Sequence, residues 1–210
     1  TLTGRATNIA MAMALASSEV NASMGKIVAC PTAGSCGILP AVILAAGEVL
    51  ELSEDEMING LLAASAVGMI IGMNATLSGA EGGCQAECGS ASAMGAAAVV
   101  ELMGGTPKMS LDAGSIILQN VLGLVCDPVA GLVEIPCAKR NAQGAITALC
   151  TADMVMAGVE AKIPFDDAVE AMYKVGKSLP SALRETAMGG VAATKEGLRL
   201  KEKVFGKNNE

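Results

Sequence analysis

Apolar positions run along this chain in long, nearly continuous stretches separated by short clusters of Gly, Pro and Ser. No segment shows the sustained alternation of β-branched and polar residues that is typical of a half-buried strand. The pattern therefore predicts an all-α protein, a compact multi-helix domain whose functional loops lie at helix ends. Helices are expected over residues 7–24, 38–52, 53–73, 84–103, 111–125, 144–161, 164–177 and 180–188.

Boundary signals support these limits. Ser53 and Glu56 have the spacing of a capping box, which marks the start of a helix. Gly104-Gly105 closes the helix expected over 84–103. Loops rich in small residues are expected at 31–37, 74–83 and 127–141, and the charged tail 195–210 is expected to fray.

Composition indicates buried helices. Hydrophobic residues make up 52% of the chain, charged residues 17% and aromatic residues only 1%. Pro, Gly, Ser or Glu interrupts the longest apolar stretches, so none reaches the roughly 18 uninterrupted apolar residues expected of a membrane-spanning helix. We therefore expect no membrane association. Because several helices are apolar on more than one face, we also expect a partner domain or subunit to cover them.

Charge and residue types narrow the chemistry. The net charge of −7, without a basic stripe, argues against a nucleic-acid partner. The chain has no histidine, which excludes a Ser-His-Asp triad, a Cys-His pair and a His-ligated metal within it. Any general base must be Lys, Glu, Asp, Cys or Tyr, or must come from a partner. Because the chain begins at Thr1 in sequence that already has a helical pattern, we expect a piece of a longer protein.

Seven cysteines without secretory marks favour metal-binding or catalytic thiols over a disulfide framework. Cys84 ends a glycine-rich loop, Cys126 begins Cys-Asp-Pro, and Cys137 follows a proline, so each lies at a boundary where the backbone turns. Three thiolates on loops can hold an inorganic cluster and leave one metal corner open for catalysis. The alternative is that all three are small buried residues.

The other cysteines carry weaker signals. Cys88 lies one helical turn after Cys84, where it is either an alternative ligand or a packing residue. Cys150 falls in an apolar run and is expected in the core. Cys30 and Cys36 flank the 31–37 loop, but their spacing is not that of a Cys-x-x-Cys redox pair.

The 31–37 loop runs toward a helix N-terminus, where exposed amides and the helix dipole favour an anion such as a substrate carboxylate. A plain turn between helices is the alternative. Arg140 is either a clamp for a carboxylate or a surface residue that caps the next helix. Glu81 and Glu87 flank Cys84, and each is either an acid or base or simply solvated.

Four motifs lie in order along the chain, at Pro31–Pro40, Asn74–Gln85, Cys126–Leu132 and Pro136–Asn141. In this order and spacing they resemble the α chain of iron–sulfur-dependent L-serine dehydratase (L-serine ammonia-lyase), particularly the two-subunit bacterial type. The steps from residue 84 to 126 and from 126 to 137 fit the cluster-ligand pattern of that family. The resemblance therefore implies a 4Fe–4S cluster on a mostly helical domain, with Cys84, Cys126 and Cys137 as ligands.

The resemblance also implies a β portion, either fused or separate, that this sequence does not contain. We expect residues 1–210 to form a single helical catalytic domain, with the N-terminal part and the β portion of the full enzyme outside it. Part of the family's pocket is supplied by that portion, including a loop with Ser and His, so the absent histidine fits a divided active site. The implied partners are L-serine and a β chain in an oligomer. The implied setting is cytoplasmic amino-acid catabolism that feeds pyruvate into gluconeogenesis.

The implied reaction is the dehydration of L-serine at the open iron, which yields pyruvate and ammonia. Its base is not identified from the sequence. The candidates for holding the amino acid are Thr32, Ala33, Gly34, Ser35, Asn74, Arg140 and Asn141. The alternatives are a related iron–sulfur lyase that releases sulfide from L-cysteine, and a non-catalytic helical subunit that binds zinc or no metal. Dehydration by pyridoxal phosphate would need a lysine and a phosphate cup, and only Lys26 lies near a small-residue loop.

Overall fold

The computed structural model describes residues 2–206, and over this range it is helical, with no strand beyond a single bridge between Cys126 and Arg184. The all-α prediction is confirmed. The helices are α1 (Gly4–Ala22), α2 (Ile38–Val49), α3 (Glu54–Asn74), α4 (Gly79–Gly82), α5 (Ser90–Leu102), α6 (Pro107–Val121), α7 (Cys137–Met156), α8 (Phe165–Ser178) and α9 (Lys195–Phe205).

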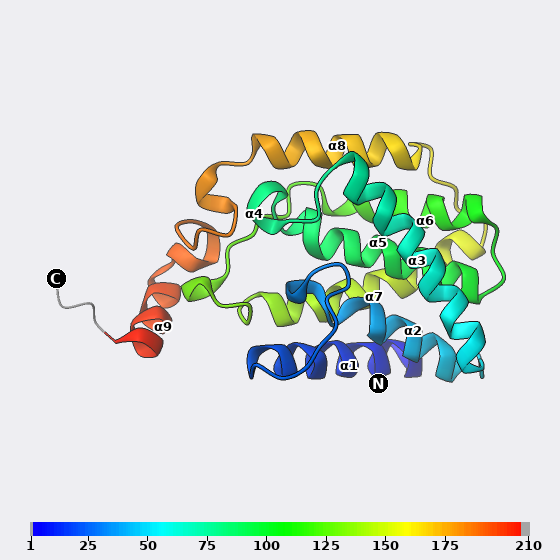
Figure 1. Cartoon of the computed structure of the whole chain (residues 1–210), viewed down its shortest axis with the longest axis horizontal. Coiled ribbons are helices and arrows are strands. Elements are labelled where there is room, and N and C mark those ends of the chain that lie inside the picture. The colour runs from blue at the N-terminus through cyan, green and yellow to red at the C-terminus, as the bar shows by residue number, and fades with distance from the viewer. Residues whose placement is uncertain (1, 207–210) are drawn as a thin grey trace.

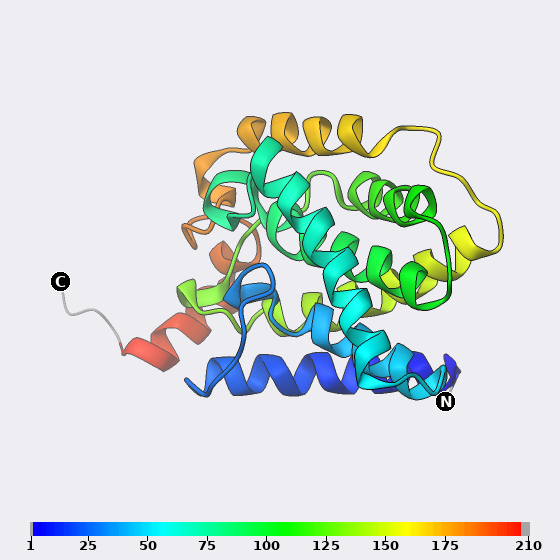
Figure 2. The ribbon, with the colours of Figure 1, turned by 45° about the vertical axis from the view of Figure 1, so that its right-hand side comes forward.

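Helix α5 lies at the centre of the bundle and packs against α2, α3, α6 and α7 (Figure 1). α1 packs against α2 and α7 along one side, whereas α8 packs against α6 on the opposite side, and the rotated view shows the same order (Figure 2). Residues 90–100 of α5 are all buried and almost all are Ser, Ala, Gly or Val. Small side chains at a helix contact shorten the distance between axes, so four neighbours can approach this one helix.

Helix α3 begins with the capping box that the sequence predicts. The Glu56 N–H donates to Ser53 Oγ, and the Ser53 N–H donates to the Glu56 carboxylate at 2.8 Å. Replacing Ser53 by alanine should lower the free energy of unfolding by about 1 kcal/mol, because the Glu56 N–H loses the Ser53 hydroxyl as its acceptor. Denaturant unfolding checks this. Ser65→Ala on the same helix is the matched control, and an equal loss in both variants would contradict the capping role.

The outer face of α3 is apolar and exposed. Leu62 is 64% exposed, Met69 62% and Met73 84%. α3 is long and apolar enough to cross a membrane, and 28% of its apolar 18-residue stretch is buried in the protein. Its buried residues form one stripe against α5, beginning with Gly60, Ala64 and Val67. The outward apolar face agrees with the expected partner, whereas the absence of membrane association stays a prediction.

Several element boundaries differ from the prediction. The helix expected from 144 begins at Cys137, directly after Pro136, so the last third of the predicted 127–141 loop belongs to α7. The helix expected from 111 begins at Pro107, where the ring suits the first helical position and the Thr106 hydroxyl accepts from the Met109 N–H. The helix expected over 84–103 is divided, because Gln85–Gly89 is π-helical and α5 follows it.

The C-terminal quarter departs furthest from the prediction. Only a short 3₁₀ turn, Ser181–Leu183, forms where a helix was expected over 180–188. Glu185 and Ala187 have φ of 64° and 55°, which ends any helix there. The tail expected to fray forms α9, capped by the Thr194 hydroxyl and packed on Val129–Gly131. Residues 207–210 of that tail lie outside the described range.

Candidate active site

Three buried thiols come from three separate segments. Cys84 lies between α4 and the π-helical turn, Cys126 lies in the extended segment after α6, and Cys137 begins α7. Their residues are 2%, 4% and 9% exposed, and all three thiols are free. In Figure 1 these segments lie at the same end of the bundle as α4 and the loop that precedes α2. The predicted position of each cysteine at a boundary is confirmed.

The thiols lie close enough to act on one another. Cys84, Cys88 and Cys126 pack in one small apolar cluster with Ile38 and Ala91. The thiol of Cys137 lies within electrostatic range of the other two predicted ligands, since each of those thiols affects its pKa or is affected by it. The fold therefore packs Cys84 and Cys126 together, although 42 residues separate them along the chain, and Cys137 is not a member of this packed cluster.

Glycine is required immediately before Cys84. Gly83 has φ of +76°, and a Cβ at this position would lie 2.7 Å from Leu179 Cδ1 and 2.8 Å from the Leu124 carbonyl oxygen. A side chain would therefore meet both an unfavourable backbone conformation and fixed backbone atoms. This close approach brings the Cys84 turn against the segment that leads to Cys126.

Gln85 is a structural residue of the site that the sequence analysis did not identify. Its side chain is fully buried, its Nε2 donates to the carbonyls of Gly82 and Met172 at 2.9 Å each, and its Oε1 accepts from the Gly123 N–H at 2.9 Å. One amide thus connects α4, α8 and the chain before Cys126. A lone glutamine in sequence gives no such signal, because its partners are distant residues.

Cys126 is held by the C-terminal segment. Its N–H donates to the Leu183 carbonyl at 2.9 Å, and its carbonyl accepts from the Glu185 N–H at 2.8 Å. The adjacent Asp127 is 2% exposed, and its Oδ2 accepts from the Val191 N–H at 2.7 Å. Glu185, which has a positive φ, therefore lies in a segment that is hydrogen-bonded to the backbone of Cys126.

Arg140 connects α7 to the segment around Cys126. Its guanidinium lies 2.9 Å from Asp127 Oδ1, and Nη1 donates to the Val125 carbonyl at 2.8 Å. The side chain is 16% exposed, so it is neither a surface residue nor a helix cap. These contacts bind the guanidinium to the Cys126 segment. The sequence, in contrast, suggested a guanidinium that is free to bind a substrate carboxylate.

The electrostatics separate Cys84 from the other two thiols. A hydrogen bond with Cys88 lowers the pKa of the Cys84 thiol against the opposing effect of burial, and the Arg140 guanidinium lowers it further. Burial raises the pKa of Cys126, and it raises that of Cys137 to about 12. Thiolates at these two positions therefore need a further positive charge nearby.

Asn141 ties the 31–37 loop to α7. Its Nδ2 donates to the Gly34 carbonyl at 2.7 Å and to the Cys137 carbonyl at 3.0 Å, while its Oδ1 accepts from the Gly37 N–H at 2.9 Å. Asn141 is 1% exposed. The loop and the start of α7 are thereby placed side by side.

Within the 31–37 loop the hydroxyl groups face the π-helical turn. Thr32 Oγ1 donates to Glu87 Oε1 at 2.5 Å and lies 3.0 Å from Ser35 Oγ. Ser35 and Gly34 are buried, whereas Ala33 is exposed. Burial raises the pKa of the Glu87 carboxyl, the Thr32 hydroxyl opposes this, and Glu185 adds to it.

Asn74 lies apart from this constellation. It is exposed at the end of α3, and its Nδ2 donates to the Ile70 carbonyl of its own helix at 2.8 Å. It lines a surface cavity of about 530 Å³ between α3 and α8, together with Asp166 and Glu170. The structure does not bring Asn74 to the 31–37 loop.

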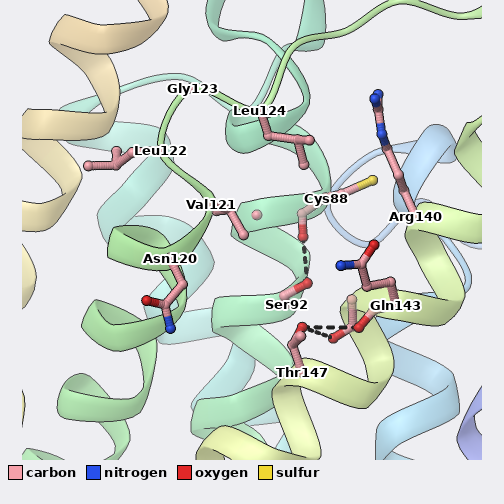
Figure 3. Close-up of a pocket in the computed structure, with 12 residues that line it drawn as sticks. Cys88, Ser92, Asn120, Val121, Leu122, Gly123, Leu124, Arg140, Gln143 and Thr147 are labelled. Carbon is pink, nitrogen blue, oxygen red and sulfur yellow. Dashed lines mark hydrogen bonds between the residues drawn. The ribbon is translucent and has the colours of Figure 1, made fainter. Parts of the chain in front are cut away.

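A cavity of about 380 Å³ opens beside Cys88, between the end of α6 and the first turns of α7. Figure 3 shows the Cys88 sulfur pointing toward Arg140, with Gln143, Thr147 and Asn120 around the opening. No sequence motif marked Asn120 or Gln143, since a lone amide carries no spacing signal. The cavity is large enough for an amino acid, but it lies behind the thiols and not at the 31–37 loop.

Two predictions about the remaining cysteines are resolved. Cys150, expected in the core, is exposed on α7, so that prediction was wrong; its apolar run wraps around the helix and one side faces outward. Cys36 is buried and Cys30 is half-buried, with Cys30 Sγ 3.6 Å from the Cys36 carbonyl. Burial raises the pKa of the Cys30 thiol to about 11, which disfavours a reactive thiolate there.

Across residues 2–206, no three His, Cys, Asp or Glu side chains are close enough to hold a single metal ion. A tetrahedral zinc site would place its sulfurs less than about 4 Å apart, given a Zn–S distance of about 2.3 Å. A cluster of several irons presents its corners at wider spacing. The zinc alternative and the cluster both stay predictions.

The fold and the site define a helical protein with a group of buried, unpaired thiols at one end of its bundle. The serine dehydratase alpha chain family matches residues 1–192. The chain belongs to this family.

Three relatives are similar over most of this chain. It is 55% identical over 197 residues to the probable L-serine dehydratase, alpha chain, of Bacillus subtilis (strain 168), covering 94% of this chain and 66% of that protein. It is 57% identical over 192 residues to the L-serine dehydratase, alpha chain, of Peptoniphilus asaccharolyticus, covering 91% and 66%. The probable L-serine dehydratase, alpha chain, of Latilactobacillus sakei is 54% identical over 195 residues, covering 93% of each. The chain thus spans just under two thirds of the first two relatives.

Proposed function

We propose that this chain is the catalytic α portion of an L-serine ammonia-lyase that dehydrates L-serine to pyruvate and ammonia with a 4Fe–4S cluster. Membership of the serine dehydratase alpha chain family supports the reaction class. The observation that carries the cluster is that three buried, free thiols come from three segments, and that two of them, Cys84 and Cys126, pack in one cluster. Cys84, Cys126 and Cys137 are the ligands in this proposal.

The residues around these thiols fit a cluster. Burial opposes ionisation of Cys126 and Cys137, so a group that carries iron cations supplies the missing positive charge. The Arg140 guanidinium already offsets the charge of Cys84 on one side. When bound, the cluster would supply Lewis-acid assistance to departure of the serine β-hydroxyl.

The chain's own residues hold the amino acid in this proposal. The 31–37 loop offers backbone amides and the hydroxyls of Thr32 and Ser35, with Ala33 and Gly34 between them, and Asn141 fixes the loop against Cys137. Arg140 acts as a brace of the Cys126 segment and not as a substrate clamp. Asn74 has no part in it, since it lines a different cavity.

The reaction balances as a β-elimination followed by hydrolysis. The Cα proton leaves, its electron pair forms the Cα=Cβ bond, and the Cβ–O bond breaks. The aminoacrylate tautomerises to an imine, and water converts that imine to pyruvate and ammonia. The net change is L-serine to pyruvate plus ammonia, because the water lost in the first step is regained in the last.

We further propose a separate β chain as partner, in a cytoplasmic oligomer. The relatives are named alpha chains, which supports a second, separate chain in the full enzyme. The exposed apolar residues Leu62, Met69 and Met73 on α3 offer a surface for a partner. The absence of histidine from this chain agrees with a pocket completed by another one.

The first test is anaerobic reconstitution with iron and sulfide, followed by EPR of the reduced protein with and without L-serine. We expect a 4Fe–4S signal that L-serine perturbs, and pyruvate formation once the remaining portion of the enzyme is present. L-Cysteine is assayed in parallel, since faster sulfide release than pyruvate formation would favour the desulfidase. A folded protein that takes up no iron would contradict the proposal outright.

A further inference from the structure

Glu87 is a carboxylate inside the candidate site to which no role has been given. It lies on the π-helical turn after Cys84, and the Thr32 hydroxyl donates to its Oε1 at 2.5 Å. Within residues 2–206 this hydroxyl is the sole hydrogen-bond donor to the carboxylate. The side chain is partly buried, while its chain neighbours from Gly82 to Ser90 are buried. One oxygen is thus held in place, and the other keeps its lone pairs for another partner. π-Helical turns are frequent at functional sites, and this one orients Glu87.

Two glycines lie close to this carboxylate and have no side chain that would collide with it. A Cβ on Gly34 would lie 2.5 Å from Glu87 Oε1 and 3.1 Å from Oε2, so any larger residue there would displace the carboxylate. A Cβ on Gly79 would lie 3.3 Å from Glu87 Oε2 and 3.1 Å from Cys126 Sγ. The carboxylate therefore lies close to the backbone of both the 31–37 loop and α4, and the same position on α4 adjoins a proposed cluster ligand.

Other candidate bases in the chain are less well placed. The chain has no histidine. Glu81 and Glu185 are both exposed, although Glu185 Oε2 also approaches Gly79, at 3.5 Å from a Cβ there. Lys139 is exposed on α7. Glu87 alone of these groups is both partly shielded from solvent and oriented by a residue of the 31–37 loop.

We propose that Glu87 is the general base that takes the Cα proton of L-serine. This inference rests on the proposed function, since it assigns the missing acid–base residue of that reaction. Glu87 Oε2 takes the proton, the Cα–H electron pair forms the Cα=Cβ bond, and the Cβ–O bond breaks. The proton then passes from Glu87 to the departing hydroxide, which leaves as water, and the carboxylate is restored. Throughout, Thr32 keeps its hydrogen bond to Oε1 and fixes the direction of Oε2.

The test uses the complete enzyme, with this chain and its remaining portion, loaded with iron and sulfide. Glu87→Gln should lower kcat for L-serine by about 10²- to 10⁴-fold, the usual contribution of a positioned acid–base group. Bound iron and sulfide, and the EPR perturbation by L-serine, should remain as in the unmodified enzyme. Glu87→Asp keeps the carboxylate but places it farther from the substrate. This variant should retain part of the activity, with a larger isotope effect on Cα-deuterated L-serine.

Glu81→Gln is the matched control, because Glu81 flanks Cys84 on the other side and is exposed. Its kcat should equal that of the unmodified enzyme. Full activity in Glu87→Gln would overturn the inference, as would loss of bound iron or of the serine-dependent EPR change in that variant, since either loss makes Glu87 structural. If the unmodified enzyme forms no pyruvate from L-serine, the proposed function itself fails, and the two failures are thereby distinguished.

Discussion

Replacing Cys126 by serine should abolish both cluster uptake and pyruvate formation in the reconstituted enzyme. The hydroxyl of serine is nearly the size of the thiol but is a poor ligand for iron, so the change removes one of three anchors while preserving the packing. Cys126 is 4% exposed, and its backbone is held by Leu183 and Glu185, so a serine here should keep the position of the cysteine. Iron and sulfide per chain, with the EPR signal, measure the loss of the cluster independently of activity.

Cys150→Ser is the matched control for this substitution. Cys150 is an exposed free thiol on α7, outside the group around Cys84, so its replacement should leave iron content, EPR and activity unchanged. Retention of the cluster and of activity in Cys126→Ser would remove Cys126 from the ligand set. In that case Cys88, which packs beside Cys84, would be the first alternative to examine.

The helices that the sequence predicted well are those set by local signals. The capping pair Ser53 and Glu56 acts within one helical turn, so its effect can be read from the sequence. The 180–188 segment failed as a prediction because its conformation is set by distant contacts. Leu183 and Glu185 pair with Cys126, and this pairing outweighs any local preference for a helix.

The same distinction applies to the candidate site. Gly and Pro next to the three cysteines placed each thiol at a chain boundary, and the structure confirms those positions. Nothing local, however, indicated that Thr32 would meet Glu87, 55 residues later, or that Gln85 would bridge α4, α8 and the chain before Cys126. The free clamp expected of Arg140 was misjudged for the same reason, since Asp127 becomes its neighbour only in the folded chain.

The contacts of Asp127 join three parts of the molecule at the proposed cluster. Its carboxylate meets Arg140 of α7 on one oxygen and the Val191 N–H of the C-terminal segment on the other. Gly190 approaches so closely that a Cβ there would lie 2.2 Å from Asp127 Oδ2. The residue after Cys126 therefore fixes the direction of the ligand loop, and stability and site geometry depend on the same side chain.

Asp127→Asn should destabilise the metal-free protein by about 3–5 kcal/mol, because it leaves the Arg140 guanidinium buried without its counter-charge. The pair lies 2.9 Å apart, with side chains 3% and 16% exposed, so solvent screens it little. Denaturant unfolding of the variant should show a lower midpoint with an unchanged m-value. In a double-mutant cycle with Arg140→Leu, the two losses should be far from additive, since the second change removes the unpaired charge.

The exposed pair of Lys162 and Glu160 gives the contrast that makes this result interpretable. Its atoms are 2.8 Å apart, close to the distance in the buried pair, but the side chains are 84% and 58% exposed. Glu160→Gln should therefore leave the unfolding midpoint unchanged. Equal, small shifts of the unfolding midpoint at both pairs would show that solvent reaches Arg140 in the folded protein. The ion pair between α7 and the Cys126 segment would then not stabilise the fold.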